Sequence, residues 1–458
     1  MSLSVVILAA GKGTRMKSAI PKVLHQLAGK PMLGHVIDTA RALAADRIAV
    51  VYGYGGETLP EAFGGQSDLQ WVRQEPQLGT GHAVQQAASI ISGSDKVLVL
   101  YGDVPLTPAP LLAELVQTAS TDNIALLTAQ LPDPYGYGRI IRNSDGEIIS
   151  IVEQQDASGE QLEIHEINTG IMALPTPRLL EYLQRINNHN AQGEYYLTDV
   201  ITLAVDEGLK IVAKQVQSVE HISGVNSRQQ LVELERFLYR QQAARLAEQG
   251  VTIRDPGRFE LRGNLQAAQD IEIDINVVLE GEVKIGSNVT IEPNCLIRNS
   301  TIANDVTILA NSIIEDSEVG DGCTVGPFAR LRPATTLQPN AKIGNFVEVK
   351  KSTIGAGSKV NHLSYIGDTL MGAGVNIGAG TITCNYDGAN KHQTIIEDDV
   401  FIGSDTQIVA PAKVGKGATI AAGTTITKQV PEGSLALSRT KQQHFDNWLR
   451  PVKKKNTK

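Results

Sequence analysis

The chain has 458 residues, enough for more than one domain, and 41 basic against 49 acidic residues give it a formal net charge of −8. This mildly acidic balance does not favour nucleic acid as a partner. Its three cysteines, Cys295, Cys323 and Cys384, have neither metal-site spacing nor the even number of a disulfide framework, so we expect a reducing compartment and a cytoplasmic protein.

The first predicted element is a buried strand over residues 4–10, SVVILAA. It is too short, and followed too soon by charge, to be a signal peptide, and no apolar run in the chain is long enough to span a bilayer. The strand leads into residues 11–15, GKGTR, and Lys22 follows shortly after. Glycines after a strand let backbone N–H groups approach an anion, while Arg15 and Lys22 add positive charge, so this segment predicts a phosphate-binding loop. Its spacing matches neither a Walker A motif nor a Rossmann fingerprint.

A second buried strand is predicted over residues 96–103, KVLVLYGD, and it ends in a carboxylate. Ligands of open α/β sheets bind outside the carboxyl ends of the parallel strands, where an Asp is suited to hold Mg²⁺. Asp103 is therefore a candidate metal ligand. A turn or helix cap before Pro105 explains the same residue equally well.

Residues 227–250 predict one helix that connects two parts of the chain. Leu231, Leu234 and Leu238 recur at helical spacing, and Gly250 is placed to end the helix. Such a helix spans roughly 30 Å at 1.5 Å per residue, so it would act as a semi-rigid spacer. We expect the sites on its two sides to work separately.

Residues 271–427 repeat in blocks of six that begin with a small aliphatic residue, such as IGSNVT at 285 and IGNFVE at 343. This period is typical of a parallel β-helix, in which three hexads close one coil and Gly, Asn or Asp supply the corners. A solenoid is a scaffold, so its chemistry is expected where the pattern breaks. The clearest break is over residues 383–394, TCNYDGANKHQT.

Polar side chains inside the hexad region are the other candidates, because a regular coil does not need them. Arg332 and Lys350 are 18 residues apart and should therefore lie together on stacked coils. His362 follows Lys350 by two hexads, which places it on a different face. Most single imidazoles on such a face are surface or corner residues, but His362 has Tyr365 and Asn376 nearby in the sequence.

Taken together, these motifs resemble one known family over the whole chain. The resemblance rests on the loop at 11–22, the strand ending LYGDVPL, and the segments Q74-x4-GTGH, GYGR at 136, IVE at 151, EINTG at 166, GEYYLTD at 193 and GVN at 224. The chain is similar to the bacterial bifunctional enzymes that combine N-acetylglucosamine-1-phosphate uridylyltransferase with glucosamine-1-phosphate N-acetyltransferase. These enzymes make UDP-N-acetylglucosamine, a precursor of peptidoglycan and lipopolysaccharide.

The resemblance implies a fold and a division of the chain. We expect a Rossmann-like α/β nucleotidyltransferase domain with a mixed, mostly parallel sheet over residues 1–228. A helical linker over 229–249 would join it to a left-handed parallel β-helix of hexapeptide repeats over 250–458, which carries the acetyltransferase.

The resemblance also implies the residues of the uridylyltransferase site. Arg15 and Lys22 would be catalytic, and Asp103 and Asn226 would bind Mg²⁺. Residues expected to bind UDP-N-acetylglucosamine are Leu8, Ala9, Ala10, Gly11, Lys22, Gln74, Gly79, Thr80, Tyr101, Gly102, Asp103, Gly138, Glu153, Asn168 and Asn226. Within this set Gln74, Gly79 and Thr80 would read the uracil. Cations and a metal fit a reaction that brings two anions together in line at the α-phosphate of UTP, with pyrophosphate leaving.

For the solenoid, the resemblance implies trimers with active sites in clefts between neighbouring chains. His362 would be the general base that takes a proton from the amino group of glucosamine 1-phosphate, a task suited to an imidazole near neutral pH. Arg332, Lys350, Tyr365 and Asn376 would bind that sugar phosphate. Acetyl-CoA, the co-substrate, would contact Ala379, Asn385, Tyr386, Ser404, Ala422 and Arg439.

A second interpretation remains open from the residues alone. In ADP-glucose pyrophosphorylases and some subunits of translation exchange factors, a similar solenoid serves regulation or assembly. The alternative is thus a sugar nucleotidyltransferase of single activity with a non-catalytic β-helix. Release of free thiol from acetyl-CoA in the presence of glucosamine 1-phosphate separates the two hypotheses.

Overall fold

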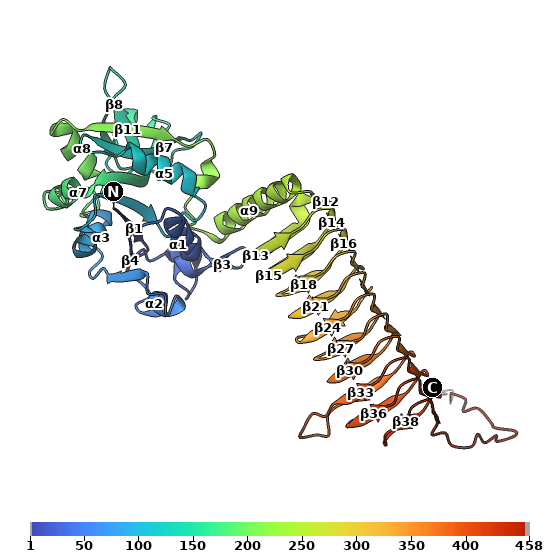
Figure 1. Ribbon diagram of the computed structural model, residues 1–458. Helices are drawn as coiled ribbons and strands as arrows, with labels where there is room; N and C mark the ends of the chain where they lie inside the picture. Colours follow the sequence, from blue (N-terminus) through green and yellow to red (C-terminus); the bar gives the residue numbers. More distant parts are fainter. Residues whose placement is uncertain (1, 454–458) are drawn as a thin grey trace, which may run out of the picture. The chain divides into compact units, whose positions relative to one another are not determined.

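The computed structural model describes residues 2–453, and the chain divides into two compact units at residues 241 and 242 (Figure 1). The division falls within helix α9 (Arg228–Glu248). Each unit has its own aliphatic core. Among residues 2–453, the helices include none with the length and apolar character needed to cross a membrane.

The first unit is built on a mixed sheet in the order β11-β7-β10-β6-β1-β4-β5, with β8 and β9 attached to β10. Only β10 in this path is antiparallel to its neighbours. The strands are β1 (Leu3–Leu8), β4 (Arg47–Tyr52), β5 (Leu69–Arg73), β6 (Lys96–Tyr101), β7 (Asn123–Gln130), β8 (Arg139–Arg142), β9 (Ile148–Val152), β10 (Glu166–Pro175) and β11 (Lys210–Gln215). A small hairpin of β2 (Gln26–Leu27) and β3 (Lys30–Pro31) lies apart. The mostly parallel sheet predicted from the sequence is confirmed.

Side chains on the two faces of this sheet belong to two separate clusters. Val5 and Ile7 of β1 belong to one cluster with helix α1, whereas Val6 and Leu8 belong to the other with α3. The helices are α1 (Met32–Ala42), α2 (Thr58–Ala62), α3 (Thr80–Gln86), α4 (Ala88–Ile91), α5 (Ala109–Thr118), α6 (Gly159–Leu162), α7 (Thr176–Leu183) and α8 (Asp199–Asp206). Short 3₁₀ turns are η1 (Thr14–Met16), η2 (Lys22–Leu24) and η3 (Val219–Ile222). Helices on both faces leave only the strand ends open for a ligand.

The second unit is a parallel β-helix, as the hexads predicted (Figure 1). One column of strands is β12 (Val251–Ile253), β14 (Ile271–Ile273), β16 (Val289–Ile291), β19 (Thr307–Ile308), β22 (Thr324–Val325), β25 (Lys342–Asn345), β28 (Lys359–His362), β31 (Asn376–Ile377), β34 (Phe401–Ile402), β37 (Thr419–Ile420) and β39 (Leu435–Ala436). The turn η4 (Pro256–Arg258) leads from β12 into the long strands β13 (Phe259–Ala267) and β15 (Val277–Ile285), which begin a second sheet.

After β15 the second sheet continues as two columns that share its pairings. The first is β17 (Leu296–Arg298), β20 (Ile313–Glu315), β23 (Arg330–Leu331), β26 (Glu348–Lys350), β29 (Tyr365–Gly367), β32 (Ile382–Cys384), β35 (Gln407–Val409) and β38 (Thr425–Ile426). The other is β18 (Thr301–Ile302), β21 (Ser317–Val319), β24 (Thr335–Leu337), β27 (Thr353–Ile354), β30 (Thr369–Met371), β33 (Thr394–Ile396) and β36 (Ala412–Val414). Each coil thus contributes three strands.

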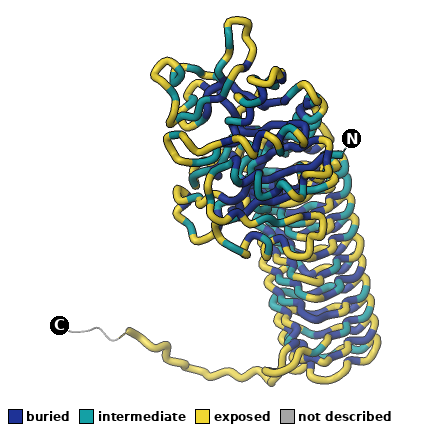
Figure 2. Tube along the Cα trace, turned by 90° about the vertical axis from the view of Figure 1, so that its left-hand side faces the viewer, coloured by how far each residue is buried: buried dark blue, intermediate teal, exposed yellow. Residues whose placement is uncertain are grey.

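The first residue of each hexad points into the coil. Ile343, Val360 and Ile377, for example, stack on successive coils at 1%, 0% and 3% exposure. Along the solenoid, buried positions alternate with exposed ones within every coil (Figure 2). One continuous aliphatic core therefore holds the coils together, and the polar chemistry is left to corners and outer faces.

Candidate active sites

A pocket of about 450 Å³ opens at the carboxyl ends of β1 and β6 in the first unit. It is lined by ten of the residues predicted for nucleotide binding, namely Leu8, Ala9, Ala10, Gly11, Lys22, Gln74, Gly79, Thr80, Tyr101 and Asp103. Lys12, Gln77 and Glu194 also line it and were not predicted. Strands β1 and β6 pair in parallel with Leu8 opposite Tyr101, which brings the loops after both strands to one edge of the sheet.

The glycine loop owes its path to close packing against Lys22. Gly13 has a φ of 58°, and a Cβ atom there would lie 2.6 Å from the Cβ of Lys22. A larger residue at this position would be strained and would displace the lysine. The sequence pattern GKGTR thus places a cation beside the loop backbone.

The ammonium group of Lys22 contacts the carboxylate of Asp103 and lies 3.0 Å from Oδ1 of Asn226. The backbone of Val225 donates a hydrogen bond of 2.9 Å to the carbonyl oxygen of Asp103, which holds the segment with Asn226 beside the end of β6. A carboxylate and an amide oxygen that converge on one cation are oxygen donors of the kind Mg²⁺ prefers. Asp103 and Asn226 therefore fit a magnesium ion, which they would hold at the end of β6.

Three residues predicted to bind the sugar, Gly138, Glu153 and Asn168, are not among those that line this pocket. The backbone of Asn168 donates to the carbonyl oxygen of Gly138 (2.8 Å), and Thr198 donates to Oε1 of Glu153 (3.0 Å). Burial raises the pKa of Glu153. Burial also raises the pKa of Tyr101, and the charges of Glu153 and Asp103 add to this effect. Both carboxylates therefore act on Tyr101, which lines the main pocket.

Arg15 lies apart from the main pocket. It is exposed on turn η1 and lines a second cavity of about 300 Å³ together with Glu153 and Tyr196. Lys22 and Arg15 were both predicted to face the phosphates, but in this structure only Lys22 contacts the predicted metal ligands. The catalytic role of Arg15 remains a prediction.

In the solenoid, one corner carries a column of predicted residues. His362 ends β28 and pairs in register with Asn345 of β25. Backbone hydrogen bonds between successive coils continue this register. The N–H of Gly380 donates to the carbonyl oxygen of Leu363, that of Asp405 to Ala379, and that of Gly423 to Ser404. The column therefore runs Asn345, His362, Ala379, Ser404, Ala422, and it joins the proposed base to three residues predicted for acetyl-CoA.

The imidazole of His362 is exposed, and its Nδ1 lies 2.9 Å from Oδ1 of Asn345. An amide oxygen can only accept, so this contact requires the proton on Nδ1. The lone pair is then on Nε2, which is the form a general base needs. Asn345 was not predicted, because its place beside His362 depends on the coil register.

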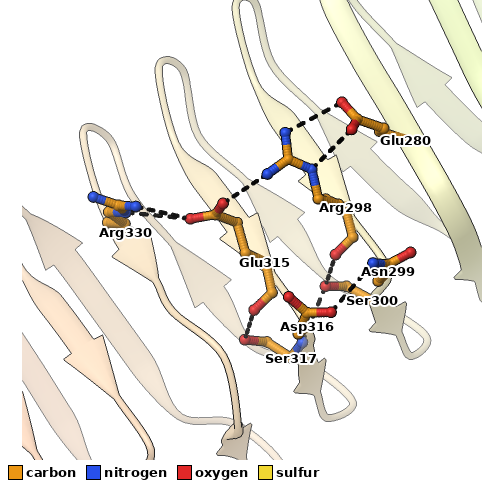
Figure 3. Close-up of polar contacts among 8 residues, drawn as sticks. All are labelled: Glu280, Arg298, Asn299, Ser300, Glu315, Asp316, Ser317 and Arg330. Atoms are coloured by element: carbon orange, nitrogen blue, oxygen red, sulfur yellow. Dashed lines mark hydrogen bonds and ion pairs between the residues drawn. The ribbon is translucent and has the colours of Figure 1, made fainter. Parts of the chain in front are cut away.

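A column of charged residues runs along the neighbouring face (Figure 3). Arg298 donates to Glu280 (3.1 Å) and to Glu315 (3.0 Å) on the coils to either side, and Arg330 continues the ladder to Glu315 (3.0 Å). By strand register the column reads Arg262, Glu280, Arg298, Glu315, Arg332, Lys350. Signs alternate until Arg332 and Lys350, where two cations follow one another.

A third cation, Lys391, lies beside Lys350 at the point where the alternation of charge ends. Contact with Lys391, from the segment that interrupts the hexads, is the largest cause of a lowered pKa at Lys350, followed by burial and then by the like charges of Lys391 and Arg332. Arg332 keeps one carboxylate partner, Glu348, at 2.8 Å. Positive charge that outnumbers its partners is suited to bind a phosphate group. Lys391 was not predicted, although it lies within the segment identified as the break.

The interrupting segment is itself anchored to the coil below. Nδ2 of Asn385 donates to Asp368 (2.6 Å) and lies 3.4 Å from the hydroxyl of Tyr365. Asp387 caps the turn by accepting from the backbone of Ala389 (2.8 Å). Tyr386 is 60% exposed on this loop. The structure thus brings Lys350, Tyr365 and Asn385 together on one side.

Two predicted residues lie elsewhere. Asn376 is in β31, in the same sheet as His362 but not in that of Lys350 and Tyr365. Arg439 follows the last strand, β39, and is exposed. The separation of Lys350 and His362 onto different sheets confirms the expectation that one face does not collect all of the acetyl-transfer residues.

Comparison with known proteins agrees with both parts of this description. Residues 5–164 match the family described as MobA-like NTP transferase domain. Residues 261–337 match the GMPPB C-terminal domain, and residues 393–428 match the bacterial transferase hexapeptide (six repeats).

Relatives also match over nearly the full length of the chain. The Bifunctional protein GlmU of Nitrosospira multiformis is 54% identical over 457 residues, which cover 100% of this chain and 99% of the relative. The Azoarcus sp. protein of the same name is 54% identical over 453 residues, 99% of this chain and 100% of the relative. That of Idiomarina loihiensis is 54% identical over 457 residues, 100% of each. With such identity over its whole length, and with the family predicted from its motifs thereby confirmed, the chain belongs to the bifunctional GlmU family.

Proposed function

We propose that the two activities of this bifunctional chain, acetyl transfer to glucosamine 1-phosphate and uridylyl transfer to N-acetylglucosamine 1-phosphate, run at the two sites described above. The observation that carries the proposal is the pair of cation arrangements. Lys22 meets two oxygen ligands at the strand ends, and Arg332, Lys350 and Lys391 gather on the solenoid. Each arrangement is suited to one phosphate-bearing substrate, and the product of acetyl transfer is the substrate of uridylyl transfer.

In uridylyl transfer, the chain's residues position two anions and do no covalent chemistry. Gln74, Gly79 and Thr80 hold the uracil, while Gly138, Glu153 and Asn168 hold the sugar. Lys22 neutralises charge as the sugar phosphate attacks the α-phosphate of UTP in line and pyrophosphate leaves. Mg²⁺, held by Asp103 and Asn226 when bound, would offset the charge that develops on the phosphates.

In acetyl transfer, Arg332, Lys350 and Lys391 bind the phosphate of glucosamine 1-phosphate, with Tyr365 and Asn376 beside the sugar. Nε2 of His362 accepts a proton from the 2-amino group as nitrogen attacks the thioester carbonyl of acetyl-CoA. The nitrogen–acetyl bond forms, the carbon–sulfur bond breaks, and coenzyme A leaves as the thiol. Ala379, Asn385, Tyr386, Ser404, Ala422 and Arg439 line the path of acetyl-CoA.

A homotrimer is the proposed assembly. Phe328, Phe346 and Leu363, which are 50%, 56% and 62% exposed, occupy successive corners directly after the His362 column. The rings of Phe328 and Phe346 are stacked, with their centroids 5.3 Å apart. All three residues have a positive φ (56°, 56° and 47°), a left-handed backbone conformation that bulky residues rarely adopt. An exposed apolar row of this kind is suited to contact another chain.

Mixed assemblies of two variants test the proposed trimer. His362→Ala chains combined with Arg439→Ala chains should recover part of the acetyl transfer if different chains supply the two residues, and no recovery despite verified mixing would place the site within one chain.

The cytoplasm is the proposed compartment, supported by the free thiols of Cys295, Cys323 and Cys384. Incubation of the purified chain with UTP, Mg²⁺, acetyl-CoA and glucosamine 1-phosphate tests the whole proposal. The expected products are UDP-N-acetylglucosamine, pyrophosphate and free coenzyme A. Pyrophosphate release from UTP and N-acetylglucosamine 1-phosphate, without any thiol release from acetyl-CoA, would instead support a non-catalytic solenoid.

A further inference from the structure

A short hydrogen-bonded series of three side chains, Gln74, His82 and Gln86, begins at the main pocket, which Gln74 lines. Gln74 follows β5 and is only 4% exposed. Its Nε2 lies 2.9 Å from the carbonyl oxygen of Gly79 and 3.1 Å from Nδ1 of His82. Nε2 of His82 lies 3.0 Å from the side-chain amide of Gln86, one turn further along α3.

The shorter contact of Gln74 with a carbonyl oxygen, 2.9 Å against 3.3 Å for Gln86, sets the arrangement of donors and acceptors. A carbonyl oxygen can only accept, so Nε2 and not Oε1 of Gln74 must face Gly79. The second proton of this amide nitrogen then points at Nδ1 of His82, which must accept it. The imidazole is therefore neutral with its proton on Nε2. Gln86 accepts that proton once its amide is turned to direct Oε1 at the ring, which gives up the 3.3 Å hydrogen bond from Nε2 of Gln86 to the carbonyl oxygen of His82. Burial lowers the pKa of His82, which favours this neutral form.

The arrangement leaves one atom of Gln74 free. Both protons of its amide nitrogen are used, whereas its Oε1 accepts no hydrogen bond from any residue between 2 and 453. Because Gln74 lines the pocket, this oxygen is available to a ligand. A free acceptor selects a donor: uracil presents an N3–H group, whereas N3 of cytosine is an acceptor.

Turning the Gln74 amide by 180° would reverse this preference. Nε2 would then face the base and could donate to N3 of cytosine. The turn would also place Oε1 against the carbonyl oxygen of Gly79 and against Nδ1 of His82, so two hydrogen bonds would become two contacts between acceptors. His82 therefore adds a second restraint on the orientation that suits uracil.

We propose that His82 is a specificity-determining positioning residue that accepts a hydrogen bond from Gln74 and so keeps the carbonyl oxygen of Gln74 directed at the nucleobase. The inference rests on the proposed binding of uridine in this pocket. His82 does not itself contact the base in this account, and it acts only through Gln74.

The test compares the ratio of kcat/KM for UTP to that for CTP among variants. His82→Phe keeps an aromatic ring beside Tyr195, whose ring centroid is 6.4 Å away, but removes the acceptor. Its ratio should fall about tenfold, the usual contribution of one hydrogen bond. His82→Asn places an acceptor near the position of Nδ1, so its ratio should stay within about threefold of the parent. His35→Phe is the matched control, because His35 is bonded to the carbonyl oxygen of Leu27, outside the pocket.

Thermal unfolding and acetyl transfer verify that each variant is folded. A folded His82→Phe enzyme with the parent ratio would overturn the proposal. So would equal losses in His82→Phe and His82→Asn, or an equal loss in His35→Phe, since packing rather than the acceptor would then be responsible. A failure of the proposed uridine binding gives a different result from a failure of the role of His82. In that case the parent enzyme itself would show no preference for UTP over CTP, whatever the variants do.

Discussion

At the scale of single residues, both sites hold cations where a phosphate is needed, but they balance the charge differently. Lys22 has a carboxylate partner, Asp103, so a bound nucleotide must compete with an existing ion pair. On the solenoid, Arg332, Lys350 and Lys391 lie together where the alternation of charge ends, and contact with Lys391 lowers the pKa of Lys350. A phosphate would relieve this repulsion. Under the proposed function, the first site would therefore need a metal to offset the phosphate charge, whereas the second would use its own cations.

Asp103→Ala should abolish uridylyl transfer, with a loss of at least about a hundredfold, because Lys22 and Asn226 cannot replace an anionic metal ligand. Acetyl transfer should stay near normal. Pyrophosphate release and thiol release measure the two reactions in the same preparation. Asp145→Ala, an exposed change on the β8–β9 hairpin, is the control and should leave both rates unchanged. Mg²⁺-dependent turnover that persists in Asp103→Ala would show that the metal is bound elsewhere.

His362→Ala should lower the rate of acetyl transfer by about 10² to 10⁴, the usual contribution of a positioned base. Its exposed ring adds little to the core, so the thermal unfolding of the second unit should not change. Asn345→Leu should produce a smaller loss in the same direction, because the ring would keep its base but lose its fixed tautomer. A His362→Ala enzyme that retains the parent rate would remove the histidine from the mechanism.

At the scale of elements, the hexads predicted the coils, because an aliphatic residue every sixth position has only one use in a stacked solenoid. The strand followed by GKGTR and the strand that ends in Asp103 were equally informative, since both end at the same edge of the sheet. Partners that depend on exact register could not be predicted. Asn345 lies beside His362 because the coils repeat there after 17 residues, which the hexad period alone does not specify.

The interrupting segment shows the same limit. Its departure from the period marked it as a site, but the direction of Lys391 depends on the anchors at Asn385 and Asp387. Pocket-lining Lys12, Gln77 and Glu194 come from loops, for which the sequence offers no periodic signal.

Lys391→Met should raise the KM for glucosamine 1-phosphate about tenfold or more, because one charged contact to the phosphate is lost. The same change should raise the pKa of Lys350 toward its ordinary value, since a neighbouring like charge is removed. Steady-state kinetics with varied sugar phosphate measure the effect. Arg330→Met is the control: its partner is Glu315, and its KM should stay close to that of the parent. Equal KM values in Lys391→Met and the parent would exclude the loop from phosphate binding.

At the scale of the whole molecule, helix α9 belongs to both units. Leu231 and Leu234 pack with Met16 and Leu27 in the first unit, whereas Ala243 and Leu246 join the core of the solenoid. The proposed division into residues 1–228, 229–249 and 250–458 therefore cuts through contacts that each unit uses. The contact-based division at residues 241 and 242 keeps these contacts on both sides.

A fragment of residues 1–228 should retain uridylyl transfer, and one of residues 250–458 should retain acetyl transfer, because each contains its own core and site residues. A fragment of residues 1–241 should unfold at a higher temperature than 1–228, since it keeps the buried Leu231 and Leu234 and the hydrogen bond from Ala28 to Glu235. Calorimetry and pyrophosphate assays compare the two. A folded fragment 1–241 without uridylyl transfer would refute the independence of the first unit.

Mixing the two single-site variants tests the central account most directly, since it holds that the two transfers run at separate sites and share only a released sugar phosphate. Asp103→Ala and His362→Ala proteins are each supplied with glucosamine 1-phosphate, acetyl-CoA, UTP and Mg²⁺, first alone and then together, and UDP-N-acetylglucosamine is measured. Each protein alone should form it at least about a hundredfold more slowly than the parent, whereas the mixture should form it at a rate set by the slower of the two remaining activities. No product from the mixture, with each protein still active in its own half-reaction, would contradict the account.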